Sequence, residues 1–139
     1  MKPGVQQIAD GLYQSALAHA STWTEAPQYV DVAVLMATPA EPLPVGVRHI
    51  MCPIADNAEG CTCLEAVKAL ASSISTERVL AVCHMGENRS GLLSALILIA
   101  RGMDSQEAIR LVQERGPHNS PTQAHSFWNP GFIRQVAAL

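Results

Sequence analysis

The stretch Val79–Arg101, VLAVCHMGENRSGLLSALILIAR, decides the fold that we expect for this chain of 139 residues. Its first part, Val79–Val82, is an apolar run of strand length, and Leu92–Ala100 is a second apolar run long enough for a buried helix. The segment between them, Cys83–Gly91, is polar and contains Gly86. The pattern therefore predicts a buried strand that passes through a short loop directly into a buried helix.

The residues of that loop favour an anion-binding site. Backbone N–H groups at the start of a helix have no partner within the helix, and together they carry about half a unit of positive charge. With the planar guanidinium of Arg89 they can bind the oxygens of a phosphate. Cysteines in such positive surroundings are commonly thiolates at neutral pH. We therefore expect Cys83 to be a nucleophile beneath a bound phosphoryl group.

The pattern Cys83-x5-Arg89-Ser90 resembles the phosphate-binding loop of the cysteine-dependent protein tyrosine phosphatases, in particular the small dual-specificity phosphatases. Further segments follow in the order that this family shows, so the resemblance covers nearly the whole chain: Gly11–Ala20, His49–Asn57, Met103–Pro117 and Trp128–Val136. The resemblance implies that the loop residues after the cysteine bind the phosphate: His84, Met85, Gly86, Glu87, Asn88 and Arg89.

One residue departs from the family pattern. A histidine usually precedes the nucleophile, and this chain has Val82 there. We therefore expect a contribution to loop rigidity and to thiolate stabilisation to be missing. His84, on the other side of Cys83, is a candidate to replace it.

The resemblance also implies roles for two residues around the nucleophile. Asp56 takes the position of the general acid in the family, and this position outweighs the Asx-turn that the sequence alone would favour for it. Glu59 is the second candidate for the acid. Ser90 is expected to donate its hydroxyl to the Cys83 sulfur, and its structural alternative is a bond to its own backbone at the helix start.

The function that we predict is a metal-independent protein phosphatase without a cofactor. It would hydrolyse phosphotyrosine through a phosphocysteine intermediate, with phosphoserine and phosphothreonine as further candidates, on a phosphorylated protein or peptide. The loop contains Glu87 and no lysine, and a carboxylate there is expected to repel polyanions such as phosphoinositides. Two alternatives remain: a rhodanese-like sulfurtransferase, and a catalytically inactive phosphate-binding module.

Composition and charge limit the partners that we expect. The net charge is −3 and the sequence pI is about 5.9, which argue against nucleic acid and against an acidic membrane surface as partners. The first residues lack the apolar core of a signal peptide, and no apolar run reaches the roughly 20 residues of a membrane-spanning helix. We expect one phosphatase domain over residues 1–139 and a cytoplasmic monomer.

The remaining cysteines, Cys52, Cys61 and Cys63, do not form a convincing metal site. The chain contains no CxxC pair, and the spacing of Cys61 and Cys63 is poor for tetrahedral zinc. We leave open that Cys52 or Cys61 protects an oxidised Cys83 by forming a disulfide with it.

The pattern along the chain predicts an α/β fold with a small mixed or parallel central sheet flanked by helices, like that of dual-specificity phosphatases. The expected strands are Val5–Ile8, Leu12–Gln14, Val30–Met36, Val47–Met51 and Val79–Val82. Helical turns are expected within Ser15–Ala26, and helices over Cys63–Ser75 and Leu92–Ala100, after Asp104 and over Pro130–Leu139. The expected helix caps are Ser15, a Thr62-x-x-Glu65 capping box, Asp104 with Glu107, and Asn129.

Two loops are expected between these elements. The first is Thr38–Gly46, which contains three prolines and a glycine. The second is His118–Phe127, which the family places near the active site. Its His118, Gln123 and His125 are candidates for contacts with substrate or water.

Overall fold

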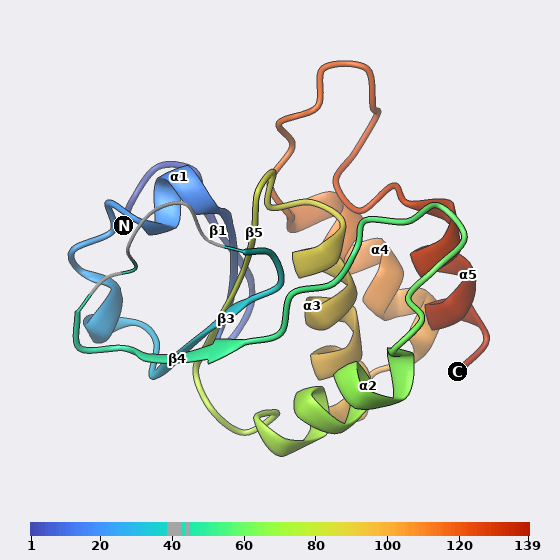
Figure 1. The fold of residues 1–139 in the computed structure, drawn as a ribbon, viewed down its shortest axis with the longest axis horizontal. Coiled ribbons are helices and arrows are strands. Elements are labelled where there is room, and N and C mark those ends of the chain that lie inside the picture. Colours follow the sequence, from blue (N-terminus) through green and yellow to red (C-terminus); the bar gives the residue numbers. More distant parts are fainter. Residues whose placement is uncertain (39–42, 44) are drawn as a thin grey trace.

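A five-stranded sheet lies at the centre of the computed structural model, which describes residues 1–38, 43 and 45–139. The strand order is β1-β2-β5-β3-β4 (Figure 1). The strands have these bounds: β1 Val5–Ala9, β2 Leu12–Ala16, β3 Val32–Leu35, β4 Arg48–Met51 and β5 Val79–Cys83. β1 and β2 form an antiparallel hairpin, and β2, β5, β3 and β4 are parallel. The predicted mixed α/β fold is thus confirmed.

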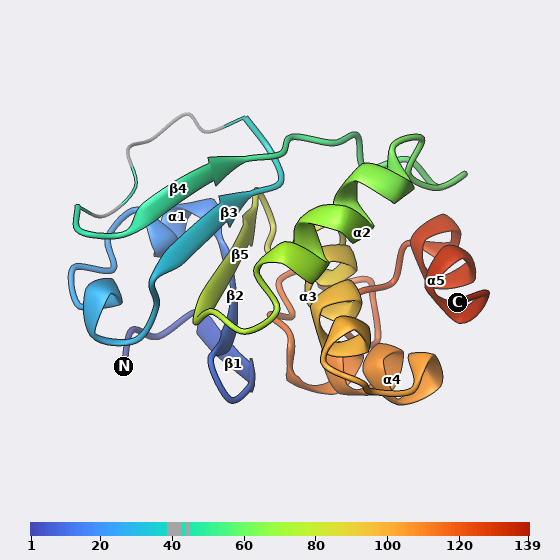
Figure 2. The same cartoon turned by 90° about the horizontal axis from the view of Figure 1, so that it is seen from below.

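Helices cover the two faces of the sheet unequally. The helices have these bounds: α1 Leu17–Ala20, the 3-10 helix η1 Ala26–Gln28, α2 Leu64–Ser73, α3 Arg89–Ala100, α4 Ser105–Arg115 and α5 Pro130–Ala137. Figures 1 and 2 show α2, α3, α4 and α5 together on one side of the sheet, and α1 on the other side. The larger part of the apolar core therefore lies between the sheet and α3.

Strand β5 is buried on both faces, as its uninterrupted apolar sequence predicts. Val79, Ala81 and Cys83 pack into the core beneath α3, whereas Leu80 and Val82 pack into a second cluster with the aromatic residues of the other face. Because side chains alternate along a strand, the last residue of β5 points toward the helical layer. Val82 thus contributes packing on the face opposite Cys83.

Two of the predicted helix caps are confirmed. The Asp104 carboxylate accepts hydrogen bonds from the backbone N–H groups of Gln106 and Glu107 at the start of α4. The Asn129 side chain accepts them from Gly131 and Phe132 at the start of α5. Both helices therefore begin where the local sequence predicts.

The other two caps are wrong. Ser15 lies inside β2, because the strand continues to Ala16, which pairs with Cys83 of β5. α2 begins after Cys63 without a side-chain cap, so the Thr62 capping box does not form. Helix α3 starts at Arg89, earlier than the apolar run that predicted it.

The two expected loops lie outside the helices and strands where the structure describes them. Of Thr38–Gly46, residues 39–42 and 44 lie outside the described residues, so that part of the prediction is not tested. The segment after α4 contains no helix or strand before α5 (Figure 1). Among the described residues, no helix has the length and apolar character needed to cross a membrane.

Candidate active site

The candidate phosphate-binding loop, Cys83–Arg89, connects the end of β5 to the start of α3. Its turn depends on Gly86, whose φ of 74° lies in the left-handed region. A Cβ atom at Gly86 would lie 2.4 Å from the backbone nitrogen of Ala16, so no side chain fits there. The loop backbone therefore packs directly on the neighbouring strand β2.

A buried glutamine in β2 supports this loop. Gln14 Nε2 donates to the Gly86 carbonyl at 2.8 Å, and Gln14 Oε1 accepts from Ser94 Oγ at 2.7 Å. Gln14, Gly86 and Ser94 are all buried. Gln14 thus connects the phosphate-binding loop to α3, a role that the sequence patterns above did not predict. A polar side chain within the apolar strand that follows Asp10-Gly11 is the signal that could have indicated it.

The sulfur of Cys83 lies at the base of the loop and contacts Ser90. The distance between Cys83 Sγ and Ser90 Oγ is 3.2 Å, and both side chains are buried. When the sulfur is ionised, the hydroxyl is the donor. The contact that the resemblance implied is therefore present in the geometry.

Arg89 is half-buried at the first position of α3. One of its terminal guanidinium nitrogens donates to the Ile54 carbonyl at 3.4 Å. Its Nε is buried and has no hydrogen-bond partner among the residues that the structure describes. A buried donor without a partner is costly, so an anion in the loop would satisfy it.

Asp56 is exposed, in the acid loop Pro53–Gly60 that follows β4. Its Oδ1 accepts from Asn129 Nδ2 at 2.7 Å, and its Oδ2 accepts from Asn88 Nδ2 at 3.4 Å. The Asx-turn that was the alternative role for Asp56 is made by the next residue, since Asn57 Oδ1 accepts from the Glu59 N–H. The structure thus links Asp56 to the phosphate-binding loop through Asn88, and Glu59 is exposed.

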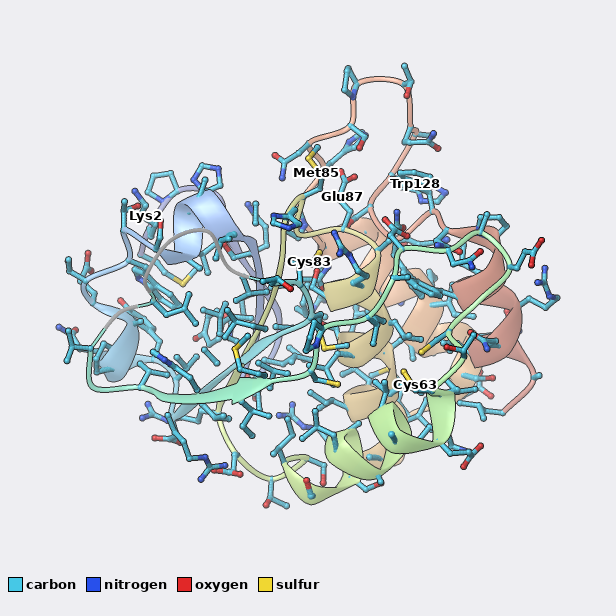
Figure 3. The ribbon with its side chains drawn as sticks, in the orientation of Figure 1. Lys2, Cys63, Cys83, Met85, Glu87 and Trp128 are labelled. Atoms are coloured by element: carbon cyan, nitrogen blue, oxygen red, sulfur yellow. The ribbon has the colours of Figure 1, made fainter. Side chains whose placement is uncertain are left out.

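Glu87 does not lie where the predicted repulsion of polyanions would require it. Its side chain is buried, and both carboxylate oxygens accept hydrogen bonds from the segment that precedes α5. At the start of the loop, His84 and Met85 are exposed. Asn88, which follows Glu87, is buried. Figure 3 shows Glu87 and Met85 near the start of α3, with Trp128 on the side of the following segment.

The three candidate contacts of the second loop are partly engaged within that loop. A ring nitrogen of His118 bonds the Gln123 carbonyl, and His125 Nδ1 bonds the Ser126 carbonyl at 2.7 Å. Both bonds shape the loop, and neither reaches the candidate phosphate-binding loop. A contact of His118, Gln123 or His125 with substrate stays a prediction.

All four cysteines are free thiols. The nearest sulfur that Cys61 contacts belongs to Cys63, at 3.6 Å, and burial raises the pKa of the Cys61 thiol to about 11. Burial also raises the pKa of Cys52. Among the described residues no group of three or more His, Cys, Asp or Glu side chains could hold a metal ion. A disulfide between Cys83 and Cys52 or Cys61 stays a prediction.

This chain is similar to known proteins in its structure and not detectably in its sequence. No protein-family model matches the sequence, and no curated protein sequence matches it. Human DUSP28 superimposes with a TM-score of 0.77 at 18% identity, over 99% of this chain and 93% of that chain. The human tyrosine phosphatase-like serine/threonine/tyrosine-interacting protein gives a TM-score of 0.70 at 19% identity, over 96% of this chain and 93% of that one.

A more distant bacterial structure shows the same arrangement. A variant of P. aeruginosa TpbA in complex with pTyr has a TM-score of 0.57 and 22% identity, over 79% of this chain and 78% of that chain. The similarity to human DUSP28 covers 99% of this chain, so it includes the sheet, the loop after β5 and the helical layer. The chain has the fold of the small dual-specificity phosphatases.

Proposed function

We propose that this protein is a metal-independent phosphatase that hydrolyses phosphotyrosine in proteins or peptides through a phosphocysteine intermediate. The observation that carries the proposal is the contact of 3.2 Å between Cys83 Sγ and Ser90 Oγ, in the turn between a parallel strand and a helix. A buried thiol at the positive end of a helix suits a nucleophile, and the unpartnered Nε of Arg89 beside it suits an anionic substrate.

The first chemical step follows from these positions. The loop amides and the Arg89 guanidinium bind the three non-bridging oxygens of the phosphoryl group and stabilise the charge that develops in the transition state. The Cys83 thiolate attacks phosphorus, and the bond to the leaving oxygen breaks. Asp56 donates a proton to that oxygen.

The second step releases phosphate from the sulfur. A water molecule attacks the phosphocysteine while Asp56 accepts a proton from it, and the Ser90 hydroxyl stabilises the departing thiolate. For the first step Asp56 must carry a proton, yet both its oxygens accept hydrogen bonds from amide groups. A protonated carboxyl oxygen keeps a lone pair that can accept, so Asp56 can donate its proton while the amides of Asn88 and Asn129 hold the carboxyl group in place.

The decisive experiment is hydrolysis of p-nitrophenyl phosphate by the wild type and by Cys83→Ser, each with EDTA. We expect an active wild type and a Cys83→Ser rate below about a tenth of it, because serine is a poor nucleophile of similar shape. The variant should still bind phosphate, with a native circular dichroism spectrum as its control. A variant that keeps more than a tenth of the rate would exclude the cysteine mechanism, and loss of wild-type activity in EDTA would exclude the metal-independent one.

The two alternative functions predict different results for the wild type. A rhodanese-like sulfurtransferase would transfer sulfur from thiosulfate to cyanide, a reaction that has no use for Asp56. A catalytically inactive module would bind phosphate through Arg89 without turnover. Hydrolysis of p-nitrophenyl phosphate, sulfur transfer from thiosulfate, and phosphate binding without either turnover therefore separate the three functions.

A further inference from the structure

The carboxylate of Glu87 is the most densely hydrogen-bonded acidic group in the described part of the chain, and the mechanism above does not use it. Its side chain is buried. Oε2 accepts from the backbone N–H groups of Asn119 and Ser120, the second at 3.0 Å. Oε1 accepts from the Ser120 hydroxyl at 2.6 Å and from the Trp128 indole N–H at 3.0 Å.

All of these donors are uncharged, and all come from the 118–128 segment. A buried carboxylate is costly unless it is well hydrogen-bonded. Burial alone would raise the pKa of Glu87, but the bonds from Ser120, Trp128 and Asn119 outweigh it, and the pKa lies below the ordinary 4.5. The carboxylate is thus held as an anion that binds the 118–128 segment to the phosphate-binding loop.

A second contact places this segment at the rim of the loop. Asn119 Nδ2 donates to the Met85 carbonyl at 2.8 Å. Met85 itself is 48% exposed, so the contact lies at the surface. Figure 1 shows the segment between α4 and α5 extending outward past the turn between β5 and α3, and Figure 3 places Glu87 and Trp128 at its base.

The 118–128 segment lies where the part of a substrate beyond the phosphoryl group must pass. With the phosphoryl group in the loop above Cys83, the rest of the substrate must leave the site past the rim. The chain from Gly116 to Leu139 contains no acidic residue, so the segment does not repel a phosphorylated ligand. A small phosphate ester ends at the rim, whereas a polypeptide continues over it.

We infer that Glu87 is a positioning residue for polypeptide substrates: it fixes the 118–128 segment against the phosphate-binding loop, and this segment contacts the polypeptide that carries the phosphorylated residue. The inference rests on the proposed phosphatase function, which it deepens. The anchor acts through the segment and does not itself touch the reacting atoms.

The test compares Glu87→Gln and Ser120→Ala with the wild type on a phosphotyrosine peptide and on p-nitrophenyl phosphate. Loss of a hydrogen bond to a charged group corresponds to about a tenfold change in an equilibrium. We therefore expect both variants to raise the ratio of the peptide KM to the p-nitrophenyl phosphate KM, by about tenfold for Glu87→Gln and less for Ser120→Ala. Glu25→Gln, the same change at an exposed glutamate outside the segment and outside the candidate site, is the matched control.

Acrylamide quenching of tryptophan fluorescence tests the anchor without any activity. Trp23 is fully buried and Trp128 is half-buried, so the quenchable signal comes mainly from Trp128. Release of the segment in Glu87→Gln should increase the quenching. If quenching increases while the two KM values change by the same factor, the segment does not contact the peptide, and the inference is wrong. Unchanged quenching would show that Glu87 is not the anchor.

Failure of the proposed function gives a separate result. If the wild type hydrolyses neither substrate, the phosphatase proposal fails, and binding of the same phosphotyrosine peptide is measured by fluorescence anisotropy. A Kd that rises about tenfold in Glu87→Gln, relative to Glu25→Gln, would still support the positioning role. An unchanged Kd would exclude it.

Discussion

The two halves of the candidate site are held in place by different means. The phosphate-binding loop is fixed from within the fold: Gly86, Glu87 and Asn88 are buried, and Gln14 bonds the loop backbone. The acid loop is exposed over 55–59, and amide side chains position its Asp56. Damage to the first half should thus affect every substrate, whereas damage to the second should depend on the leaving group.

The largest expected effect tests the acid loop. Asp56→Asn removes the proton donor, and general acid catalysis contributes typically about 10² to 10⁴-fold. We expect a loss in this range for phenyl phosphate or phosphotyrosine, whose leaving oxygens need a proton. The loss in the phosphorylation step should be far smaller for an ester with an acidic leaving group. Burst kinetics measure this step apart from phosphocysteine hydrolysis.

A second variant in the acid loop tests whether Asp56 is the acid. Glu59→Gln is the matched control in the same loop. Equal slowing of phosphorylation for good and poor leaving groups would assign Asp56 a purely structural role, and a selective effect in Glu59→Gln would make Glu59 the acid.

The next largest effect tests the phosphate-binding loop, which the fold holds in place. In Gly86→Ala the new Cβ must move from 2.4 Å to an ordinary contact distance from the Ala16 nitrogen, which displaces the loop by about 1 Å. A displacement of this size costs about 10²-fold in rate. The loss in kcat/KM should be the same for good and poor leaving groups, unlike that of Asp56→Asn.

Gly102→Ala separates this effect from ordinary backbone strain. Gly102 also has a positive φ, of 101°, but nothing lies within 4 Å of the position that a Cβ atom would take there. We expect it to lower stability slightly and to leave kcat/KM nearly unchanged. If Gly86→Ala behaved like Gly102→Ala, close packing of the loop on β2 would not matter for the site.

Local sequence predicted the parts of the molecule that local interactions determine. The β5-loop-α3 unit follows from two apolar runs around Gly86, and the caps Asp104 and Asn129 act on their own helices. The failures have tertiary causes. Ser15 is taken into β2 by pairing of the strand with β5.

The missing cap of α2 has a similar cause. Gln135 of α5 accepts from the Cys61 N–H at 2.8 Å and donates to the Cys61 carbonyl at 2.9 Å, which fixes the chain just before the helix. The residue types of Thr62 and Glu65 contain no information about α5. For the same reason the partners of Glu87, more than 30 residues away along the chain, could not be found without the fold.

A smaller effect concerns how Asp56 is placed. Asn129→Ser keeps a capping oxygen for α5 but removes the amide that donates to Asp56 Oδ1 at 2.7 Å. Loss of one hydrogen bond to a charged group changes an equilibrium or rate constant by about tenfold. We therefore expect about a tenfold loss of kcat on substrates with poor leaving groups. Asn129→Ala, which also loses the cap, should in addition be less stable by about 1 kcal/mol in urea unfolding. Equal kcat in Asn129→Ser and the wild type would show that Asn88 alone suffices.

The smallest expected effect is a pH dependence of stability that comes from Glu87. Its pKa is lowered in the folded protein, because the bonds from Ser120, Trp128 and Asn119 outweigh the burial that would raise it. A lowered pKa contributes stability above the unfolded value near 4.5, and this contribution is lost as the pH falls through the folded value. The free energy of unfolding of the wild type should therefore decrease below about pH 4.5 more steeply than that of Glu87→Gln.

Glu107 provides the control for this measurement. Its pKa is also lowered, mainly by the hydrogen bond from Arg110, but this pair is exposed on α4. Salt screens exposed pairs much more than buried groups. The free energy of unfolding is measured against pH by urea unfolding in about 0.5 M salt. Under these conditions Glu107→Gln should show the same pH slope as the wild type, whereas Glu87→Gln should still differ from it. If salt removed both differences, the Glu87 carboxylate would be solvated, and the phosphate-binding half of the site would be no more firmly held than the acid loop.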